Sequence, residues 1–380
     1  MDYINREVCV ITGKKDLEHL YTLKDFPVFI GCTSTDRKQD LFADMEWLIS
    51  KSSGVIQLKK LLPLDVIYSE YHSEAIGEIW HRHHEQFSDF ICDNVKDLTI
   101  LEMGGSNGTL AEKCLKKNKN IRWTIVEPNL DPKYKPTSSN INICKSYIED
   151  QLDIITKSDV FVHSHVLEHL YTPYETMQIV ANKQSVGDKM IFSIPDLHNY
   201  LKNKFANSIN FEHTYFLSDT VTDYLLERLG YSIKEKKYFE GHSIFYFCEF
   251  KGISNDLIYK LDYYKEYKTL YLSMIEFYTK EVKRLNEIIK NWEGSIYLFG
   301  AHIFSQFLIY MGLETHRLNG IIDNSKEKEN KRLYGSSLLV NNPNILVGRD
   351  DVLAIVKGGQ YQEEIEKQLF EINKDLCIVN

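Results

Sequence analysis

Short apolar runs alternate with longer segments of helical periodicity from residue 98 onward. The runs predict β-strands at Thr99–Met103, Arg122–Val126, Val160–His163, Met190–Ile194 and Ser243–Phe250. Between them, apolar positions three and four residues apart predict helices, for example over 174–182 and 219–229. Strands separated by helix-length segments predict an α/β fold with a mostly parallel, doubly wound, Rossmann-like sheet.

The flanking regions follow other patterns. The N-terminal part reads as irregular, with one strand candidate at Gly54–Leu58, and a long helical segment covers 255–290. The strand–glycine–helix–strand–acid order then restarts at Ser295. We therefore expect an N-terminal lobe over 1–75, a core over 76–252, a helical connector over 253–292 and a C-terminal Rossmann-like α/β lobe over 293–380.

The first core strand ends in a glycine-rich turn. Glu102 precedes Gly104, Gly105 and Gly108, and Glu127 stands at the end of the next predicted strand. Glycines allow close approach of a ligand, and an acid at the second strand end suits the hydroxyls of a ribose. The spacing Glu-x-Gly-x-x-x-Gly differs from that of dinucleotide binders, and no Gly-Lys-Ser/Thr follows to hold a triphosphate.

S-Adenosylmethionine, which has a ribose and no phosphates, fits this motif best. We expect the glycine turn to wrap its methionyl half, Glu102 to lie near its ammonium group and Glu127 to bind its ribose. A glycine turn after the first strand also occurs in α/β proteins without this ligand, so the turn alone does not establish S-adenosylmethionine as the ligand.

Another polar turn follows the predicted strand Val160–His163. Ligands of open parallel sheets bind beyond the carboxyl ends of the strands, so His165 is expected to face the same cofactor crevice. Glu168 and His169 have a simpler alternative role, which is to cap and pack the helix that begins there.

Net charge, apolar runs and cysteine content limit the partners and the cellular locations that we expect. The net charge of −9 argues against nucleic acid or an anionic membrane as the main partner. The beginning of the sequence lacks a signal-peptide pattern, and no apolar run approaches transmembrane length. Seven scattered cysteines without a Cys-x-x-Cys pair indicate reduced thiols, so we expect a cytoplasmic protein.

The segments Glu102–Leu110, Val126–Pro128 and His165–Leu170 together resemble the class I S-adenosylmethionine-dependent methyltransferases. The whole layout resembles the sugar C-methyltransferases of deoxysugar biosynthesis. That family has an N-terminal zinc-binding lobe, a methyltransferase core and a C-terminal Rossmann-like lobe that helps to hold a nucleotide-diphosphate sugar. The resemblance implies an enzyme with S-adenosylmethionine as cofactor and such a sugar as acceptor, and we expect a monomer or a homodimer.

The resemblance also places the acceptor chemistry. Family members carry Tyr-x-Glu-His after the fourth core strand, with the histidine as general base; Glu212 and His213 match, and Asn210 stands in the tyrosine position. A histidine beside an acid suits this role, because the acid orients the ring and favours its protonated form. The other expected substrate contacts are Tyr68, Tyr71, Asn210 and Tyr215, with Gly300 and His302 of the last lobe.

Two departures from the family pattern leave alternatives open. Of the two Cys-x-x-Cys pairs that would bind zinc, only Cys9 remains, since Thr12, Ser50 and Ser53 occupy the other positions, so we expect no metal. Asn210 in the tyrosine position puts a carbon acceptor in doubt and favours a hydroxyl. The alternatives are a non-catalytic protein that binds S-adenosylmethionine or a sugar nucleotide, and an NAD-dependent sugar oxidoreductase.

Overall fold

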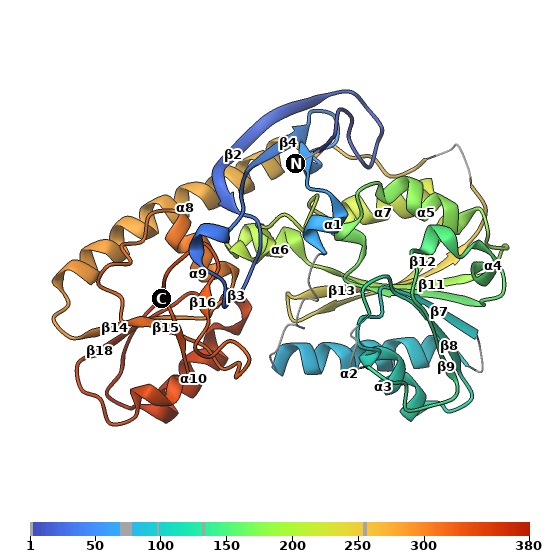
Figure 1. Cartoon of the computed structure of the whole chain (residues 1–380). Helices are drawn as coiled ribbons and strands as arrows, with labels where there is room; N and C mark the ends of the chain where they lie inside the picture. Colours follow the sequence, from blue (N-terminus) through green and yellow to red (C-terminus); the bar gives the residue numbers. More distant parts are fainter. Residues whose placement is uncertain (1–2, 69–77, 97–98, 131–133, 254–256) are drawn as a thin grey trace. The chain divides into compact units, whose positions relative to one another are not determined.

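A computed structural model describes residues 3–68, 78–96, 99–130, 134–253 and 257–380 of the chain (Figure 1). The chain forms two compact units. The first unit comprises residues 1–18, 48–198 and 214–264, and the second comprises 19–47, 199–213 and 265–380. The expected N-terminal lobe is therefore shared between the two units.

The first unit is built on a seven-stranded sheet of order β12-β13-β11-β10-β7-β8-β9. Five of its strands are parallel: β7 (Thr99–Met103), β8 (Arg122–Val126), β9 (Ile141–Cys144), β10 (Val160–Ser164) and β11 (Lys189–Pro195). The hairpin β12 (Tyr231–Phe239) and β13 (Ser243–Phe250) joins β11 in antiparallel orientation. The expected α/β class and parallel core are confirmed.

Helices cover both faces of this sheet. In Figure 1, α2 (Glu78–Asn94) and α3 (Thr109–Lys117) lie on one face, and α5 (Pro173–Ala181) and α7 (Asp219–Arg228) lie on the other. Helix α7 begins where the Ser218 side chain accepts a hydrogen bond from Val221 N, the usual N-cap arrangement. The shorter helices are α1 (Leu64–Ile67), α4 (Leu152–Ile155) and α6 (Leu197–Lys202).

The N-terminal segment is more regular than its sequence suggests. A three-stranded sheet of order β2-β4-β5 contains β2 (Leu17–Pro27), β4 (Phe42–Ser50) and β5 (Ile56–Leu58). The expectation of an irregular chain here is wrong. Along β2 the buried residues Leu20, Leu23 and Phe26 recur every three positions, so the alternation that signals a strand is hidden.

Positions that match family zinc ligands are joined by hydrogen bonds in this chain. Cys9 Sγ lies 3.7 Å from Ser53 Oγ, and Ser53 Oγ donates to Ser50 Oγ over 2.8 Å. Ser50 Oγ in turn donates to Asp16 Oδ1 over 2.9 Å. These short polar side chains tie the N-terminal loop to the end of β4.

The second unit contains a parallel sheet of five strands, in the order β17-β15-β14-β18-β19. The strands are β14 (Ser295–Phe299), β15 (Gly320–Ile322), β17 (Val340–Asn341), β18 (Val352–Val356) and β19 (Cys377–Val379). Helix α9 (Ile303–Tyr310) lies on one face and α10 (Gln362–Ile372) on the other (Figure 1). Four further two-residue strands are β1 (Ile4–Asn5), β3 (Cys32–Thr33), β6 (Lys60–Leu61) and β16 (Arg332–Leu333).

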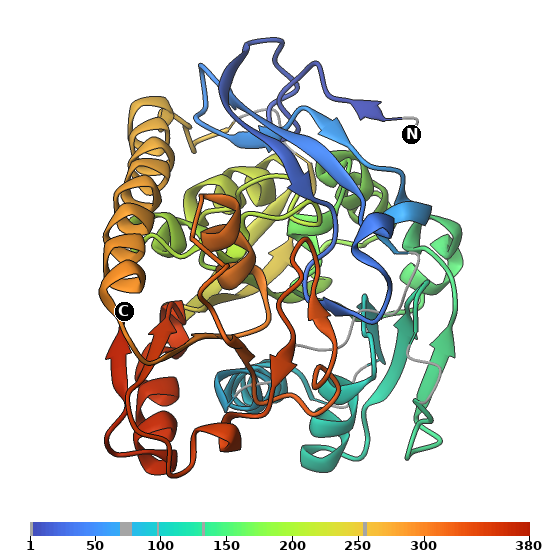
Figure 2. The same cartoon turned by 60° about the vertical axis from the view of Figure 1, so that its left-hand side comes forward.

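The expected helical connector is a single helix, α8 (Tyr264–Asn291), which Figure 2 shows as one uninterrupted element. Residues 257–263 precede it without helical structure, so the helix starts later than the sequence pattern indicated. Its buried side chains, including Tyr271, Met274 and Tyr278, recur at helical spacing, as expected of an amphipathic helix. Among the described helices, α8 included, none has the length and apolar character needed to cross a bilayer.

The hydrogen-bonded chain at Ser50 predicts a measurable loss of stability. Ser50→Ala removes one partner each from Asp16 and Ser53, and should lower the free energy of unfolding by about 2 kcal/mol. Thr12→Ala is the matched control: the Thr12 hydroxyl accepts only a solvent-exposed 3.3 Å contact from Lys14 N, so its loss should cost less than about 0.5 kcal/mol. Urea unfolding of both variants measures the difference, and equal costs would contradict the role of this chain.

Candidate functional site

The first unit has a crevice position set by its strand order. All five parallel strands run in the same direction, but β8 and β9 are added on one side of β7 and β10 and β11 on its other side, so the strand order reverses between β7 and β10. In open α/β sheets, ligands bind beyond the carboxyl ends of the strands at this reversal. The glycine turn follows β7, Glu127 follows β8 and His165 lies just beyond β10, so all three stand at this edge.

Glycine is required within the turn after β7. Gly104 and Gly108 have φ values of 76° and 70°, which side-chain-bearing residues rarely adopt. A Cβ on Gly104 would also lie 2.4 Å from Val166 Cγ2. The glycine turn therefore packs directly against the turn that follows β10, and the sequence has little freedom at residue 104.

The carboxylate of Glu127 faces this turn. Its Oε2 accepts a hydrogen bond from Ser106 N over 3.3 Å, and its Oε1 accepts one from Asn129 N over 2.8 Å. The side chain is half-buried, so it remains reachable from the crevice. A carboxylate bonded to a turn N–H repels a phosphate at that place and offers its remaining lone pairs to hydroxyl groups.

Glu102 lies beneath the turn. Its carboxylate is only 2% exposed and accepts a 2.8 Å hydrogen bond from Trp123 Nε1. Burial, with a smaller contribution from the charge of Glu127, raises the pKa of Glu102 to about 8. A Cβ on Gly105 would lie 3.0 Å from Glu102 Oε2, so the carboxyl group lies against the glycine turn, and its expected contact with the ammonium group of a cofactor stays a prediction. Both faces of the sheet are covered by helices, so a polar side chain on β7 points into the core.

His165 is joined to residues that the sequence did not single out. Its Nε2 lies 2.9 Å from Ser243 Oγ, its Nδ1 lies 3.4 Å from Glu168 Oε1, and Ser243 Oγ lies 2.6 Å from His242 Nδ1. For Glu168 the sequence left capping or packing of a helix as the simpler alternative role; its side chain is fully buried beside two histidines. The sequence feature that could have pointed to Glu168 is its place, an acid about one turn beyond the end of β10.

Two residues expected to touch the substrate have structural roles instead. Tyr215, in the first unit, is fully buried and its hydroxyl donates to Leu167 O over 2.6 Å. Asn210, in the second unit, is 3% exposed, and its Oδ1 accepts hydrogen bonds from Glu212 N and His213 N over 2.9 and 2.8 Å. Asn210 thus shapes the turn that presents the expected base, His213, which is half-buried.

The tyrosines expected from the N-terminal segment are only partly described. Tyr68 is half-buried at the end of α1. Tyr71 lies outside the described residues.

The second unit repeats the arrangement found at Glu127. Asp323, at the end of β15, accepts a hydrogen bond from Ala301 N in the turn after β14 over 2.7 Å, and Lys328 Nζ lies 3.1 Å away. A Cβ on Gly300 would meet no atom within 4 Å, so the space beside this turn is open. His302 is exposed at the N-cap of α9. Gly300, His302 and Asp323 therefore share one edge of this sheet.

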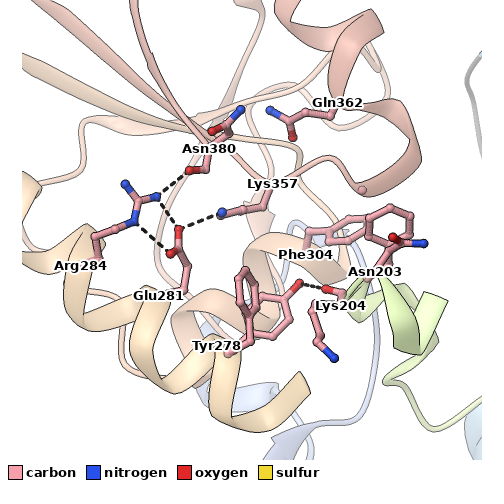
Figure 3. Close-up of a pocket in the computed structure, with 12 residues that line it drawn as sticks. Asn203, Lys204, Tyr278, Glu281, Arg284, Phe304, Lys357, Gln362 and Asn380 are labelled. Atoms are coloured by element: carbon pink, nitrogen blue, oxygen red, sulfur yellow. Dashed lines mark hydrogen bonds and ion pairs between the residues drawn. The ribbon is translucent and has the colours of Figure 1, made fainter. Parts of the chain in front are cut away.

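A pocket of about 420 Å³ lies within the second unit (Figure 3). Its aromatic walls include Phe277, Tyr278 and Phe304, while Lys357 enters from the loop after β18. Glu281 is held between Lys357, at 2.8 Å, and Arg284, at 2.5 Å, as the dashed lines in Figure 3 mark. No sequence motif was assigned to this pocket. The feature that could have pointed to it is Lys357-Gly-Gly, which directly follows the apolar run of β18.

No protein-family model matches the chain, and no curated protein sequence matches it. Solved structures resemble it in part. Human N-acetylserotonin methyltransferase in complex with S-adenosylmethionine is 12% identical over 46% of this chain and 53% of its own, with a TM-score of 0.38. A putative S-adenosylmethionine-dependent methyltransferase from Listeria monocytogenes is 12% identical over 45% of this chain and all of its own, with a TM-score of 0.36.

The plantazolicin methyltransferase BpumL, solved with a substrate analogue and S-adenosylhomocysteine, is 11% identical over 46% of this chain and 84% of its own, with a TM-score of 0.36. This chain thus matches about half the length of the human enzyme. Because identities and TM-scores are low, the function proposed below rests on the geometry of the two units.

The buried Glu102 predicts a pH-dependent stability difference. Its pKa is about 8 in the folded protein and near 4.3 in an unfolded chain, so the folded state alone holds this proton between these pH values. This residue's contribution to stability therefore falls as the pH rises from about 4 to about 8. Glu102→Gln, which is neutral throughout, should match the native protein at about pH 5 and exceed it in stability at about pH 9. Chemical unfolding at both pH values tests this, and a constant difference would contradict it.

Proposed function

We propose that the chain is a methyltransferase whose first unit binds S-adenosylmethionine and whose acceptor is a nucleotide-activated sugar. The bound donor would supply an electrophilic methyl group on a sulfonium sulfur. The residues of the chain would hold the nucleoside, orient the acceptor and accept its proton.

The observation that carries this proposal is the placement of Glu127. Its carboxylate lies at the strand-order reversal, half-buried, and is bonded to Ser106 N of the glycine turn. A ribose diol is the ligand group that a carboxylate in this position binds well, whereas a phosphate would meet a like charge. A nucleoside without phosphates, such as S-adenosylmethionine, satisfies both conditions.

The second unit supports a nucleotide as part of the acceptor. Asp323 offers a carboxylate beside the open space at Gly300. Unlike Glu127, it is paired with a cation, Lys328 Nζ at 3.1 Å, which offsets its repulsion of a phosphate. In the pocket of Figure 3, Lys204, Arg284 and Lys357 outnumber the single acid Glu281, which suits an anionic group. Aromatic walls suit a planar base next to that anion.

For the proton transfer we propose His213, with Glu212 as its neighbour. Asn210 fixes the main chain of both residues, so the imidazole is presented from a hydrogen-bonded turn. If the acceptor is a carbon beside a keto group, His213 removes its proton; if the acceptor is a hydroxyl, the same base removes the hydroxyl proton. Because Asn210 serves the turn, its presence in the tyrosine position does not discriminate between these acceptors.

Two other functions remain as outcomes of the tests. A non-catalytic binding protein would bind S-adenosylmethionine or a sugar nucleotide without turnover. An NAD-dependent sugar oxidoreductase is favoured by one observation, the acid–turn arrangement at Asp323 and Gly300, and would bind NAD in the second unit.

The role of Glu127 predicts a loss of affinity on substitution. Glu127→Gln should weaken S-adenosylmethionine binding by about 10- to 100-fold, because hydrogen bonds to a charged group are worth about 1.5–3 kcal/mol. Asp153→Asn, at an exposed acid of the same unit, is the control and should leave the affinity unchanged. Isothermal titration calorimetry measures both; equal affinity of the Glu127→Gln variant and the native protein, or binding of NAD alone, would overturn the proposal.

The role of His213 predicts loss of turnover without loss of donor binding. His213→Ala should lower methyl transfer to nucleotide sugars by about 10²- to 10⁴-fold, the range for a general base, and leave S-adenosylmethionine affinity within about twofold. His316→Ala, at an exposed histidine of the same unit, should retain activity. Mass spectrometry with an isotope-labelled methyl donor follows the product. Native turnover in the His213→Ala variant would remove this residue from the mechanism.

A further inference from the structure

Glu168 is a fully buried carboxyl group in an unusual environment. Its residue is 0% exposed, and no side chain among the described residues donates a hydrogen bond to its oxygens. Its Oε1 lies 3.4 Å from His165 Nδ1 and 3.9 Å from His169 Nε2. An ionised carboxylate without hydrogen bonds is costly in the interior, so burial favours the protonated form of this group.

His165 is held so that its Nδ1 faces Glu168. Its Nε2 is anchored at Ser243 Oγ, and Ser243 is itself bonded to His242 Nδ1. The backbone of His165 has a φ of 52°, a left-handed conformation that is unfavourable for a residue other than glycine. Strain of this kind persists where the surroundings fix a side chain in one position, and it is concentrated at functional sites.

This pair lies next to the expected position of the donor's sulfur. The strand order β8-β7-β10 puts the turn of β10 about two strand spacings, or about 10 Å, from Glu127. Val166, in the turn after β10, lies against Gly104, so this turn and the glycine turn are in contact. The sulfur of S-adenosylmethionine is bonded to the ribose carbon C5′. A ribose held by Glu127 therefore leaves the sulfonium over β7 and β10.

The histidines beside His165 pack against an aromatic ring. The ring of Trp80 lies between them, with its centroid 4.9 Å from that of His165 and 4.6 Å from that of His242. Both ring nitrogens of His165 already face Ser243 and Glu168. The cluster therefore serves to hold His165 in place.

We propose that Glu168, buried beside the fixed imidazole of His165, is a proton-exchanging carboxyl group whose proton occupancy follows the charge of the methyl donor in the crevice. This inference rests on the proposed function, because it requires S-adenosylmethionine to bind in the first unit. Glu168 is a positioning and charge-balancing residue and is not placed in contact with the acceptor.

Donor binding and methyl transfer would both change the charge beside Glu168. A sulfonium nearby stabilises the ionised form of Glu168, so donor binding releases a proton to solvent. In the transfer the S–CH₃ bond breaks with its electron pair staying on sulfur, the acceptor–CH₃ bond forms, and the acceptor proton passes to the base. The sulfur is then uncharged, and Glu168 takes up a proton again. Burial raises the pKa of Glu168 to about 7, so this exchange falls at neutral pH.

Other titratable groups contribute to the field at this pair. Within the first unit they are His163 of β10, His169 beside Glu168, His83 and His84 of α2, Tyr215, and Glu240 and His242 of the β12–β13 turn. Burial lowers the pKa of His163 to about 3 and that of His84 to about 4, so both are neutral at pH 7. Glu168 is therefore the group of this set that a nearby cation shifts through neutrality.

Proton release on ligand binding tests the proposal without turnover. Calorimetric titrations at about pH 7 in two buffers of different ionisation enthalpy give the number of protons released. We expect the native protein to release about half a proton more with S-adenosylmethionine than with the uncharged S-adenosylhomocysteine. In the Glu168→Gln variant this difference should fall to near zero. Asp153→Asn, at an exposed acid of the same unit, is the control and should retain the difference.

A direct measurement removes dependence on any variant. Carbon-13 NMR of side-chain-labelled glutamate should show one buried carboxyl titrating near about pH 7, with its midpoint lowered by S-adenosylmethionine and unmoved by S-adenosylhomocysteine. The signal should be absent from the Glu168→Gln variant. If both ligands bind and release equal numbers of protons, the inference is wrong while the proposed function stands. If neither ligand binds, the proposed function fails and this inference fails with it.

Discussion

A carboxylate that accepts a hydrogen bond from a turn N–H, at the tips of two adjacent parallel strands, is the constraint on which the site depends. Glu127 holds Ser106 N in the first unit, and Asp323 holds Ala301 N in the second. In each unit the acid ends the second strand and the turn ends the first. In the first unit this arrangement fixes the turn, disfavours a phosphate at its N–H groups and leaves an acceptor for ribose hydroxyls. The chain therefore carries the same carboxylate–turn arrangement once in each unit.

The interior strands were predictable because burial on both faces makes them nearly continuous apolar runs. β7, β8 and β13 have the bounds that the sequence indicated. The missed strand β12 contains Lys-Glu-Lys-Lys, and it forms the edge of the sheet, where charged residues are favoured. In β2 the buried positions do not alternate, so the residues carry no strand signal. Whether such segments form strands depends on their pairing with neighbours far away in the sequence.

In the candidate site, too, the residues that are close in sequence were predictable and those far apart in sequence were not. Gly104 and Glu127 belong to one local β-α-β unit, so their spacing alone brings them to one edge of the sheet. Ser243 lies 78 residues from His165, and only the pairing of β13 with β11 brings it to the strand ends. The burial of Glu102 and Tyr215 was not predictable, because sequence does not tell whether a side chain at a strand end or turn points outward or into the core. Both point inward, Glu102 to Trp123 and Tyr215 to Leu167.

The most direct test of the account is a crystal structure of the protein with S-adenosylhomocysteine. The account predicts the adenosine beyond the carboxyl ends of β7 and β10, with both ribose hydroxyls within hydrogen-bond distance of the Glu127 carboxylate. A nucleoside bound elsewhere, or a ribose that makes no contact with Glu127, would contradict it.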